Sequence, residues 1–337
     1  MSHKVPLREL GQDCGFSAAI GLKTCQKQSV AQTGAFAEIG SGRVQEKTTG
    51  SRTFIGWAPL AGFPVIVFWL QDRVKPWVFM WALAFTIYFG LKWLTWWRVK
   101  EPVRSVWRSI AYLFAFPGMD AESFLQETKR VPSPRLREWL RAVVQIVVGA
   151  MLVWIVAPKF AQGQPLLPGW MGMLGAILIF HFGIFQISAL LWQTSGIDAE
   201  PIMANPLRSR SLGEFWGKRW NLGFRELAHE LIFLPFRGYI GPEYAAFLVF
   251  LTSGIVHDLV ISVPARGGYG LPTAYFVLQG FGVLLERATF GKQLGLGRGL
   301  RGWFFMAFVL ITPLFWLFHP LFVLRVIIPF MHAIRAL

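Results

Sequence analysis

The chain has 337 residues, of which 54% are hydrophobic, and it contains 31 phenylalanines and 16 tryptophans. This composition, together with long apolar runs, excludes an ordinary soluble domain. The formal net charge of +15 would suit nucleic acid, but the basic residues cluster between apolar runs, where membrane topology and anionic headgroups explain them better. We therefore expect an all-α, polytopic helical membrane protein with no nucleic-acid partner.

The first 50 residues are polar and rich in Gly, Ser, Thr and Gln. They predict a disordered or weakly ordered extension at 1–50, followed by a membrane domain at 51–337. A basic start followed by a short apolar core is missing, so we do not expect a cleavable signal peptide. Cys14 and Cys25 lie in this extension at a spacing that matches no metal site, so neither a disulfide framework nor a zinc site is expected.

Apolar runs begin at Phe54 and predict about eight spans with interfacial helices around a central substrate tunnel. The predicted spans are 54–70, 76–97, 139–157, 166–192, 240–263, 269–290, 302–319 and 320–335. Residues 106–118 are too short to span and predict a segment that lies at the membrane interface or dips into the bundle. No internal repeat is evident, which counts against a transporter built from duplicated halves.

Basic residues gather in alternate connections between these spans. Connections 98–141, 193–239 and 287–301 hold nine, six and four Lys and Arg, whereas those at 71–75, 158–165 and 264–268 hold two, one and one. The positive-inside rule then predicts an integral multi-pass protein with the basic connections and both termini in the cytoplasm. In a bacterium this would be the inner membrane.

The connection 193–239 is the longest and has a Ser-x-x-Glu capping box at Ser211 and Glu214. The box predicts one helix at the membrane interface, packed against the mouth of the bundle. Its apolar side would carry Leu212, Phe215, Trp216, Gly223 and Leu227, and its positive charge would come from Lys218, Arg219 and Arg225.

The span 240–263 carries the pair His257-Asp258 within an otherwise apolar run. Ionisable side chains inside a membrane are costly and usually face a cavity or a partner, so this pair is a functional candidate. Gly254 and Ser253, three and four residues earlier, share a face with His257. Such small residues either let a neighbouring helix approach closely or leave room for a substrate chain.

Two ordered motifs resemble the membrane-bound O-acyltransferase superfamily, in particular its wax-synthase-like branch. The first is Ser211-Leu212 with the run FWGKRWN ending at Asn221, and the second is the run SGIVH ending at His257. The stretch ARGGYGLPTAYFVLQGFGVLLER is also similar to bacterial members of that branch, so the resemblance covers roughly 105–290. Many relatives have His-Glu where this chain has His257-Asp258, which shortens any supporting carboxylate by one methylene.

The resemblance implies transfer of a fatty acyl group from acyl-CoA to a lipid hydroxyl, most readily a long-chain alcohol that becomes a wax ester. His257 would be the general base, because a neutral imidazole accepts a proton well, and the Asn221 amide would stabilise or position the thioester oxygen. The expected substrate-binding residues are Trp216, Lys218, Arg219, Trp220, Arg225, Ser253, Gly254 and Asp258. Acyl-CoA is a co-substrate, and neither a cofactor nor a metal is expected.

Several alternatives remain open at this stage. Without a nucleophile elbow, direct transfer is favoured over an acyl-enzyme, and the acceptor could also be a polysaccharide or another hydroxyl. Outside this class, His257-Asp258 could couple protons in a transporter, or His181 and His257 could ligate haem. We favour packing for His181, and His229 in AHELIFLPF imitates a His-Glu motif within an interfacial stretch.

Overall fold

The computed structural model describes residues 42–99, 105–126 and 131–337. Cys14, Cys25 and most of the predicted N-terminal extension lie outside the described residues. Helix α2 (Gly42–Phe68) begins inside that predicted extension. The assignment of 1–50 as a disordered extension therefore stays a prediction.

The described residues form helices and no strands, which confirms the expected all-α class. The long elements are α2, α3 (Pro76–Arg98), α6 to α7 (Leu136–Met151, Leu152–Val156 as η1, Ala157–Lys159), α8 to α9 (Leu166–Ile177, Leu178–Ile184 as η2, Phe185–Thr194), α13 (Pro242–Ala265), α14 (Leu271–Arg287) and α16 (Gly299–Ile311). The short elements are α4 (Val106–Ala115), α5 (Ala121–Leu125), η3 (Pro206–Arg208), α10 (Leu212–Glu214), η4 (Phe215–Arg219), α11 (Leu222–Ala228), η5 (His229–Phe233), α12 (Leu234–Ile240), α15 (Thr289–Leu294), α17 (Leu314–Leu317), α18 (Pro320–Phe322), η6 (Val323–Ile327) and α19 (Ile328–Ala333).

Each predicted span coincides with a helix or a run of helices, but these differ in length. Five helices of the described chain are long and apolar enough to cross a membrane, namely Pro76–Arg98, Leu136–Lys159, Leu166–Thr194, Pro242–Ala265 and Gly299–Leu317. The apolar helices Thr53–Phe68 and Pro320–Ala333 are shorter, and α14 has only 17 residues. The chain is thus a polytopic helical membrane protein. The predicted count of eight spans is not confirmed, and the predicted orientation of the protein in the membrane stays a prediction.

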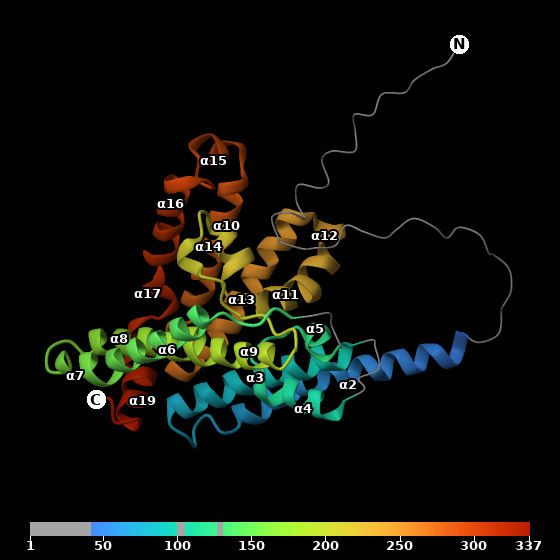
Figure 1. Cartoon of the computed structure of the whole chain (residues 1–337), viewed down its shortest axis with the longest axis horizontal. Helices are drawn as coiled ribbons and strands as arrows, with labels where there is room; N and C mark the ends of the chain where they lie inside the picture. Colours follow the sequence, from blue (N-terminus) through green and yellow to red (C-terminus); the bar gives the residue numbers. More distant parts are fainter. Residues whose placement is uncertain (1–41, 100–104, 127–130) are drawn as a thin grey trace, which may run out of the picture.

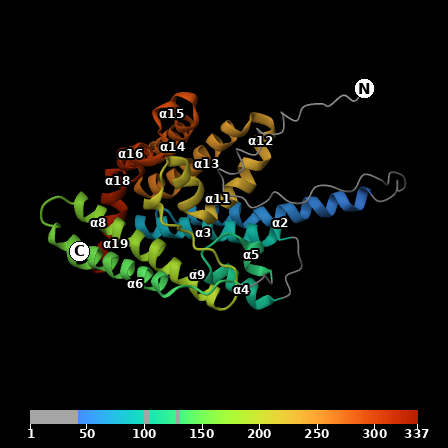
Figure 2. The same ribbon diagram turned by 45° about the horizontal axis from the view of Figure 1, so that its top comes forward.

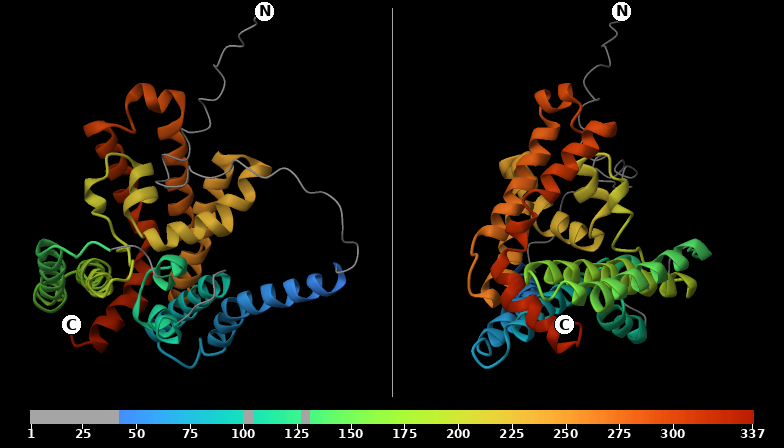
Figure 3. Two further views of the ribbon diagram at one scale, coloured as in Figure 1. Left: turned by 45° about the vertical axis from the view of Figure 1, so that its right-hand side comes forward. Right: turned by 90° about the vertical axis from the view of Figure 1, so that its left-hand side faces the viewer.

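The helices run in two main directions. Figures 1 and 3 show α14 and α16 rising together to α15 at one end of the molecule, steeply inclined to α2 and α3. Figure 2 shows α6, α8 and α9 together along one side. Glycines let neighbouring backbones meet closely, as membrane helices commonly do. A Cβ on Gly90 of α3 would lie 2.6 Å from the Leu60 Cα of α2, and one on Gly149 of α6 would lie 2.6 Å from the Gly175 oxygen of α8.

The segment predicted at the membrane interface folds as the short helix α4, which is held to α3 by polar contacts. The side chain of Lys92 in α3 is fully buried, and its Nζ donates to the Gly118 oxygen at 2.7 Å. The same Nζ lies 3.2 Å from the centre of the Tyr112 ring, a cation–π arrangement. The Tyr112 hydroxyl in turn donates to the Met119 oxygen at 3.0 Å. These contacts fix α4 and the loop before α5 against α3.

Candidate functional site

The first motif folds as α10 and η4, and a bend at its last residue leads into α11. The Ser211 hydroxyl accepts from the backbone N–H of Glu214 at 3.0 Å, which confirms the predicted cap. The Glu214 carboxylate accepts from the backbone N–H of Arg210 at 2.8 Å, so the reciprocal half of the capping box is missing. The prediction of one continuous helix is wrong, because η4 ends at Arg219 and Asn221 takes a left-handed conformation with φ 45° before α11 begins. Asparagine tolerates this conformation better than most residues.

The apolar side of the first motif is buried even though the helix is broken. Of the five residues predicted on this side, Leu212, Phe215, Gly223 and Leu227 are buried and Trp216 is half-buried. The Phe215 ring stacks on the Trp220 ring, with 5.3 Å between the ring centroids. The bend therefore turns the chain without exposing the residues that anchor it.

His257 lies on α13, half-buried, with one of its ring nitrogens fixed. Its Nδ1 is 2.7 Å from the backbone oxygen of Ser253, which can only accept a hydrogen bond. The contact thus assigns the proton to Nδ1 and leaves Nε2 of a neutral imidazole with a free lone pair. Within the described residues, no hydrogen bond involves Nε2. This arrangement suits a group that accepts a proton.

Helix α14 brings the two motifs together. The His257 ring lies 4.4 Å from the Phe276 ring of α14, and the Phe276 ring lies 5.6 Å from the Trp216 ring, measured between centroids. The Trp216 Nε1–H donates to Gln279 Oε1 at 3.4 Å. Gln279 is fully buried and donates from Nε2 to the Val309 oxygen at 2.9 Å. Gln279 was not among the predicted site residues, although a polar side chain within this apolar run was a possible signal.

Asn221 contributes its backbone to the bend between η4 and α11. Its N–H points at the Met203 sulfur at 3.4 Å, and its oxygen accepts from the backbone N–H of Arg225 at 3.1 Å. The side chain makes no capping hydrogen bond at the start of α11. The structure thus gives Asn221 a conformational role, and the predicted role of its amide stays a prediction.

Gly254 and Asp258 join α13 to α14. A Cβ on Gly254 would lie 2.8 Å from the Thr273 Cα, so of the two alternatives for this glycine the structure supports close helix approach. The Asp258 carboxylate accepts from the backbone N–H of Gly270 at 2.7 Å and from the Thr273 hydroxyl at 2.8 Å. These contacts make one carboxylate oxygen of Asp258 a cap on the start of α14, and the substrate-binding role expected for Asp258 stays a prediction.

The basic residues between 208 and 225 fall into two groups, those that are ion-paired and those that are exposed. Arg219 pairs with Glu214 at 2.6 Å and donates to the Ala204 oxygen at 3.1 Å. Arg225 pairs with Glu226 at 2.5 Å and donates to the Gly217 oxygen at 3.0 Å. Both guanidinium groups are therefore engaged in holding the first motif together. Three other basic side chains of the segment are exposed, namely Arg208, Arg210 and Lys218.

Burial raises the pKa of Glu226 to about 7, although the charge of Arg225 opposes this rise. Nearby, burial lowers the pKa of His229, and the charges of Arg225 and Arg237 lower it further. The His229 ring stacks on the Phe233 ring, with 5.2 Å between centroids. This histidine is thus occupied by packing within η5.

Two further histidines lie apart from the motifs. His181 is in the π-helical segment η2, where its ring packs on Phe185 and its buried Nδ1 has no hydrogen-bond partner among the described residues. His319 is buried and accepts from the backbone N–H of Phe322 at 3.2 Å, which caps α18. In the described part of the chain, no group of three or more His, Cys, Asp or Glu residues could hold a metal ion.

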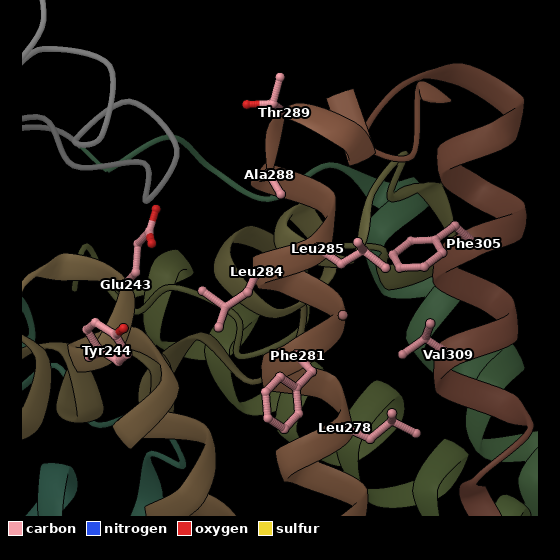
Figure 4. Close-up of a pocket in the computed structure, with 11 residues that line it drawn as sticks. Glu243, Tyr244, Leu278, Phe281, Leu284, Leu285, Ala288, Thr289, Phe305 and Val309 are labelled. Carbon is pink, nitrogen blue, oxygen red and sulfur yellow. The ribbon is translucent and has the colours of Figure 1, made fainter. Parts of the chain in front are cut away.

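A groove of about 720 Å³ lies between α14, α16 and the start of α13 (Figure 4). Glu243 and Tyr244 line one side of it, and Leu285 and Phe305 point towards each other on the other side. His257 is not among the described residues that line this groove. A substrate tunnel at His257 stays a prediction.

Residues 199–278 match the membrane bound O-acyl transferase family. This range contains both motifs, with Asn221 in the first and His257 in the second. The resemblance to the membrane-bound O-acyltransferases is confirmed.

The similar curated proteins include plant acyltransferases. A probable long-chain-alcohol O-fatty-acyltransferase 3 of Arabidopsis thaliana is 28% identical over 176 residues, which are 49% of this chain and 50% of that protein. The long-chain-alcohol O-fatty-acyltransferase of Simmondsia chinensis is 27% identical over 203 residues, 54% of this chain and 56% of the relative. The acyl-CoA–sterol O-acyltransferase 1 of Arabidopsis thaliana is 30% identical over 139 residues, 38% and 40% of the two chains. The chain thus spans about half the length of the curated relatives it matches.

Proposed function

We propose that this protein is a membrane O-acyltransferase that moves a fatty acyl group from acyl-CoA to a lipid hydroxyl, with a long-chain alcohol as acceptor and a wax ester as product. The observation that carries the proposal is the state of His257, whose Nδ1 is bonded to the Ser253 oxygen while Nε2 is left to accept a proton. The names of the plant relatives support the choice of acceptor.

His257 would act as the general base in a direct transfer. An alcohol is a weak nucleophile at neutral pH, so Nε2 takes its proton as the oxygen attacks the thioester carbonyl. The tetrahedral intermediate collapses with cleavage of the C–S bond, and the imidazolium returns the proton to the departing sulfur of coenzyme A. The products are the ester and the free thiol, and the imidazole is restored. An amide such as that of Asn221 would stabilise the oxyanion.

The exposed cations of the segment 208–225 would receive the charged part of the donor. Coenzyme A carries phosphates that cannot enter the hydrocarbon, so its headgroup must stay at a water-exposed, basic rim. Arg208, Arg210 and Lys218 are exposed and can supply this field. Arg219 and Arg225 would act indirectly, because the Arg219 ion pair with Glu214 and the Arg225 hydrogen bond to the Gly217 oxygen hold the rim in shape.

The test is an assay of membranes with labelled acyl-CoA against fatty alcohols, diacylglycerols and sterols. His257→Ala should lower turnover by about 10²–10⁴-fold, the usual contribution of a general base, at a normal yield of protein. The control His229→Ala should retain most activity, since that ring only packs on Phe233. Retention of more than about a tenth of activity by His257→Ala would disprove the role of the base. If the wild-type protein forms no labelled ester with any acceptor, the function itself is wrong.

The role of the Asn221 amide needs a variant that preserves the bend. Because φ of Asn221 is 45°, alanine would strain the backbone, whereas glycine adopts this conformation freely. Asn221→Gly should therefore keep the fold and lower kcat by about 10–10³-fold, up to the effect of losing one oxyanion donor. An unchanged kcat in Asn221→Gly would leave the residue with its conformational role alone.

A further inference from the structure

Glu286, in the last turn of α14, is a buried carboxylate that holds the start of the first motif. Only 8% of the residue is exposed. Its Oε2 accepts from the backbone N–H of Leu212 at 2.7 Å and from that of Gly213 at 3.3 Å. These are the first two residues of α10, whose N–H groups have no partner within the helix. A carboxylate supplied by another helix therefore caps α10.

Steric contacts also hold the segment from Arg210 to Leu212, which forms a corner against α14 and α16. Leu212 is fully buried, and a Cβ on Gly282 of α14 would lie 2.7 Å from its Cδ2. A Cβ on Gly302 of α16 would lie 2.2 Å from the Arg210 oxygen. Neither glycine leaves room for a larger residue, so the corner at Arg210 and Leu212 fits closely onto α14 and α16. Glu286 supplies the polar contact at this corner.

The same helix carries the groups that meet His257 and Trp216. Phe276 contacts the His257 ring, and Gln279, three residues later, accepts from the Trp216 indole. Glu286 follows Gln279 by two helical turns and so lies on the same side of α14. A rise of 1.5 Å per residue places Glu286 about 15 Å along the axis from Phe276. The segment from Leu212 to Trp216 is thus attached to α14 at both ends.

We propose that Glu286 is a positioning residue for acyl transfer. By fixing the start of α10 it sets where Trp216 lies against Phe276, and hence the geometry around His257. Its oxygens face backbone N–H groups of the first motif, so it acts through Trp216 and does not touch the reacting atoms. This inference rests on the proposed function, because its effect is expressed in the rate of acyl transfer.

The first test separates kcat from KM in Glu286→Ala and Glu286→Gln. Because small displacements near a reacting centre cost up to about 10²-fold in rate, Glu286→Ala should lower kcat by about 10–10²-fold and leave both KM values within about threefold. Glu286→Gln keeps an oxygen for the Leu212 N–H and should recover most of the rate. The matched control is Glu138→Ala, which removes a carboxylate that caps α6 by accepting from the backbone N–H of Arg135 at 2.9 Å. Its kcat should be unchanged.

A double-mutant cycle then tests whether Glu286 acts through Trp216. Trp216→Phe keeps a ring against Phe276 but loses the hydrogen bond to Gln279. Glu286→Ala should cost much less kcat in the Trp216→Phe background than in the wild type, since residues acting through one contact are not additive. Additive losses, an unchanged kcat in Glu286→Ala, or an equal loss in Glu138→Ala would each overturn the proposal.

A labelling experiment gives a readout that does not depend on catalysis. With Cys14 and Cys25 replaced by serine, Leu212→Cys places a thiol at the buried corner that Glu286 caps. A maleimide should label this thiol slowly in the parent and at least about tenfold faster when Glu286→Ala is added, because an opened segment exposes it. Equal labelling rates would refute the positioning role. If the wild type forms no ester product, the proposed function is wrong, but the labelling result for Glu286 still stands.

Discussion

Replacing Asp258 would distinguish a helix cap from a group of the reaction site. The carboxylate bonds the Gly270 N–H at 2.7 Å and the Thr273 hydroxyl at 2.8 Å. Hydrogen bonds to charged groups contribute about 1.5–3 kcal/mol, and the loss of a helix cap costs about 0.5–2 kcal/mol. We therefore expect Asp258→Ala to lower the free energy of unfolding by about 2–3 kcal/mol.

Asp258→Asn should cost less stability, because the amide oxygen can still accept from Gly270. Thr273→Val, which removes only the side-chain partner, should cost about 1 kcal/mol. The assay is thermal melting of the detergent-purified variants, together with kcat of the folded fraction. The folded fraction of each variant should turn over within a few-fold of the wild type. If Asp258→Asn melts normally but loses as much turnover as His257→Ala, Asp258 acts in the reaction site and not as a helix cap.

Variants of Lys218, Gly254 and Glu226 provide three further tests. Lys218→Glu should raise the KM for acyl-CoA more than the KM for the alcohol, and this effect should shrink as salt rises. Arg219→Ala should chiefly lower the melting temperature. Equal changes in the two KM values of Lys218→Glu would contradict the role of Lys218 in binding acyl-CoA. Gly254→Ala should destabilise the protein by about 1–3 kcal/mol, because its Cβ would meet the Thr273 backbone at 2.8 Å, and an unchanged melting temperature would exclude close packing there. The pKa of Glu226 is raised to about 7 in the folded protein, so its contribution to stability should be fully present below about pH 4.5 and be lost as pH rises towards 7. Glu226→Gln should flatten this dependence of the free energy of unfolding on pH. An unaltered pH profile in Glu226→Gln would disprove the role of Glu226.

The sequence by itself determined the class of this protein and where its long apolar helices lie. In hydrocarbon every backbone polar group must be satisfied within the protein, and an apolar run of about 20 residues achieves this as a helix. The cap at Ser211 was equally predictable, because a hydroxyl and an N–H three residues apart meet through local geometry alone. The order of the two motifs, ending at Asn221 and His257, also identified the family that residues 199–278 match.

The break at Asn221 could not be predicted from periodicity. The apolar residues on both sides of the break are buried, so the pattern reads as one helix even though the chain turns between them. Their burial depends on several neighbouring elements, which a repeat along one helix cannot describe. Only the fold decided that the left-handed conformation of Asn221 is used here.

Pairings between distant segments were decided by the tertiary structure alone. Hydropathy marks Asp258 as unusual in its span, but it does not say whether the carboxylate faces a substrate or the start of α14. Likewise Gln279 and Glu286 take their roles from Trp216 and Leu212, more than 60 residues earlier in the chain. A polar side chain in an apolar helix must find a partner, and which partner it finds depends on how the helices pack.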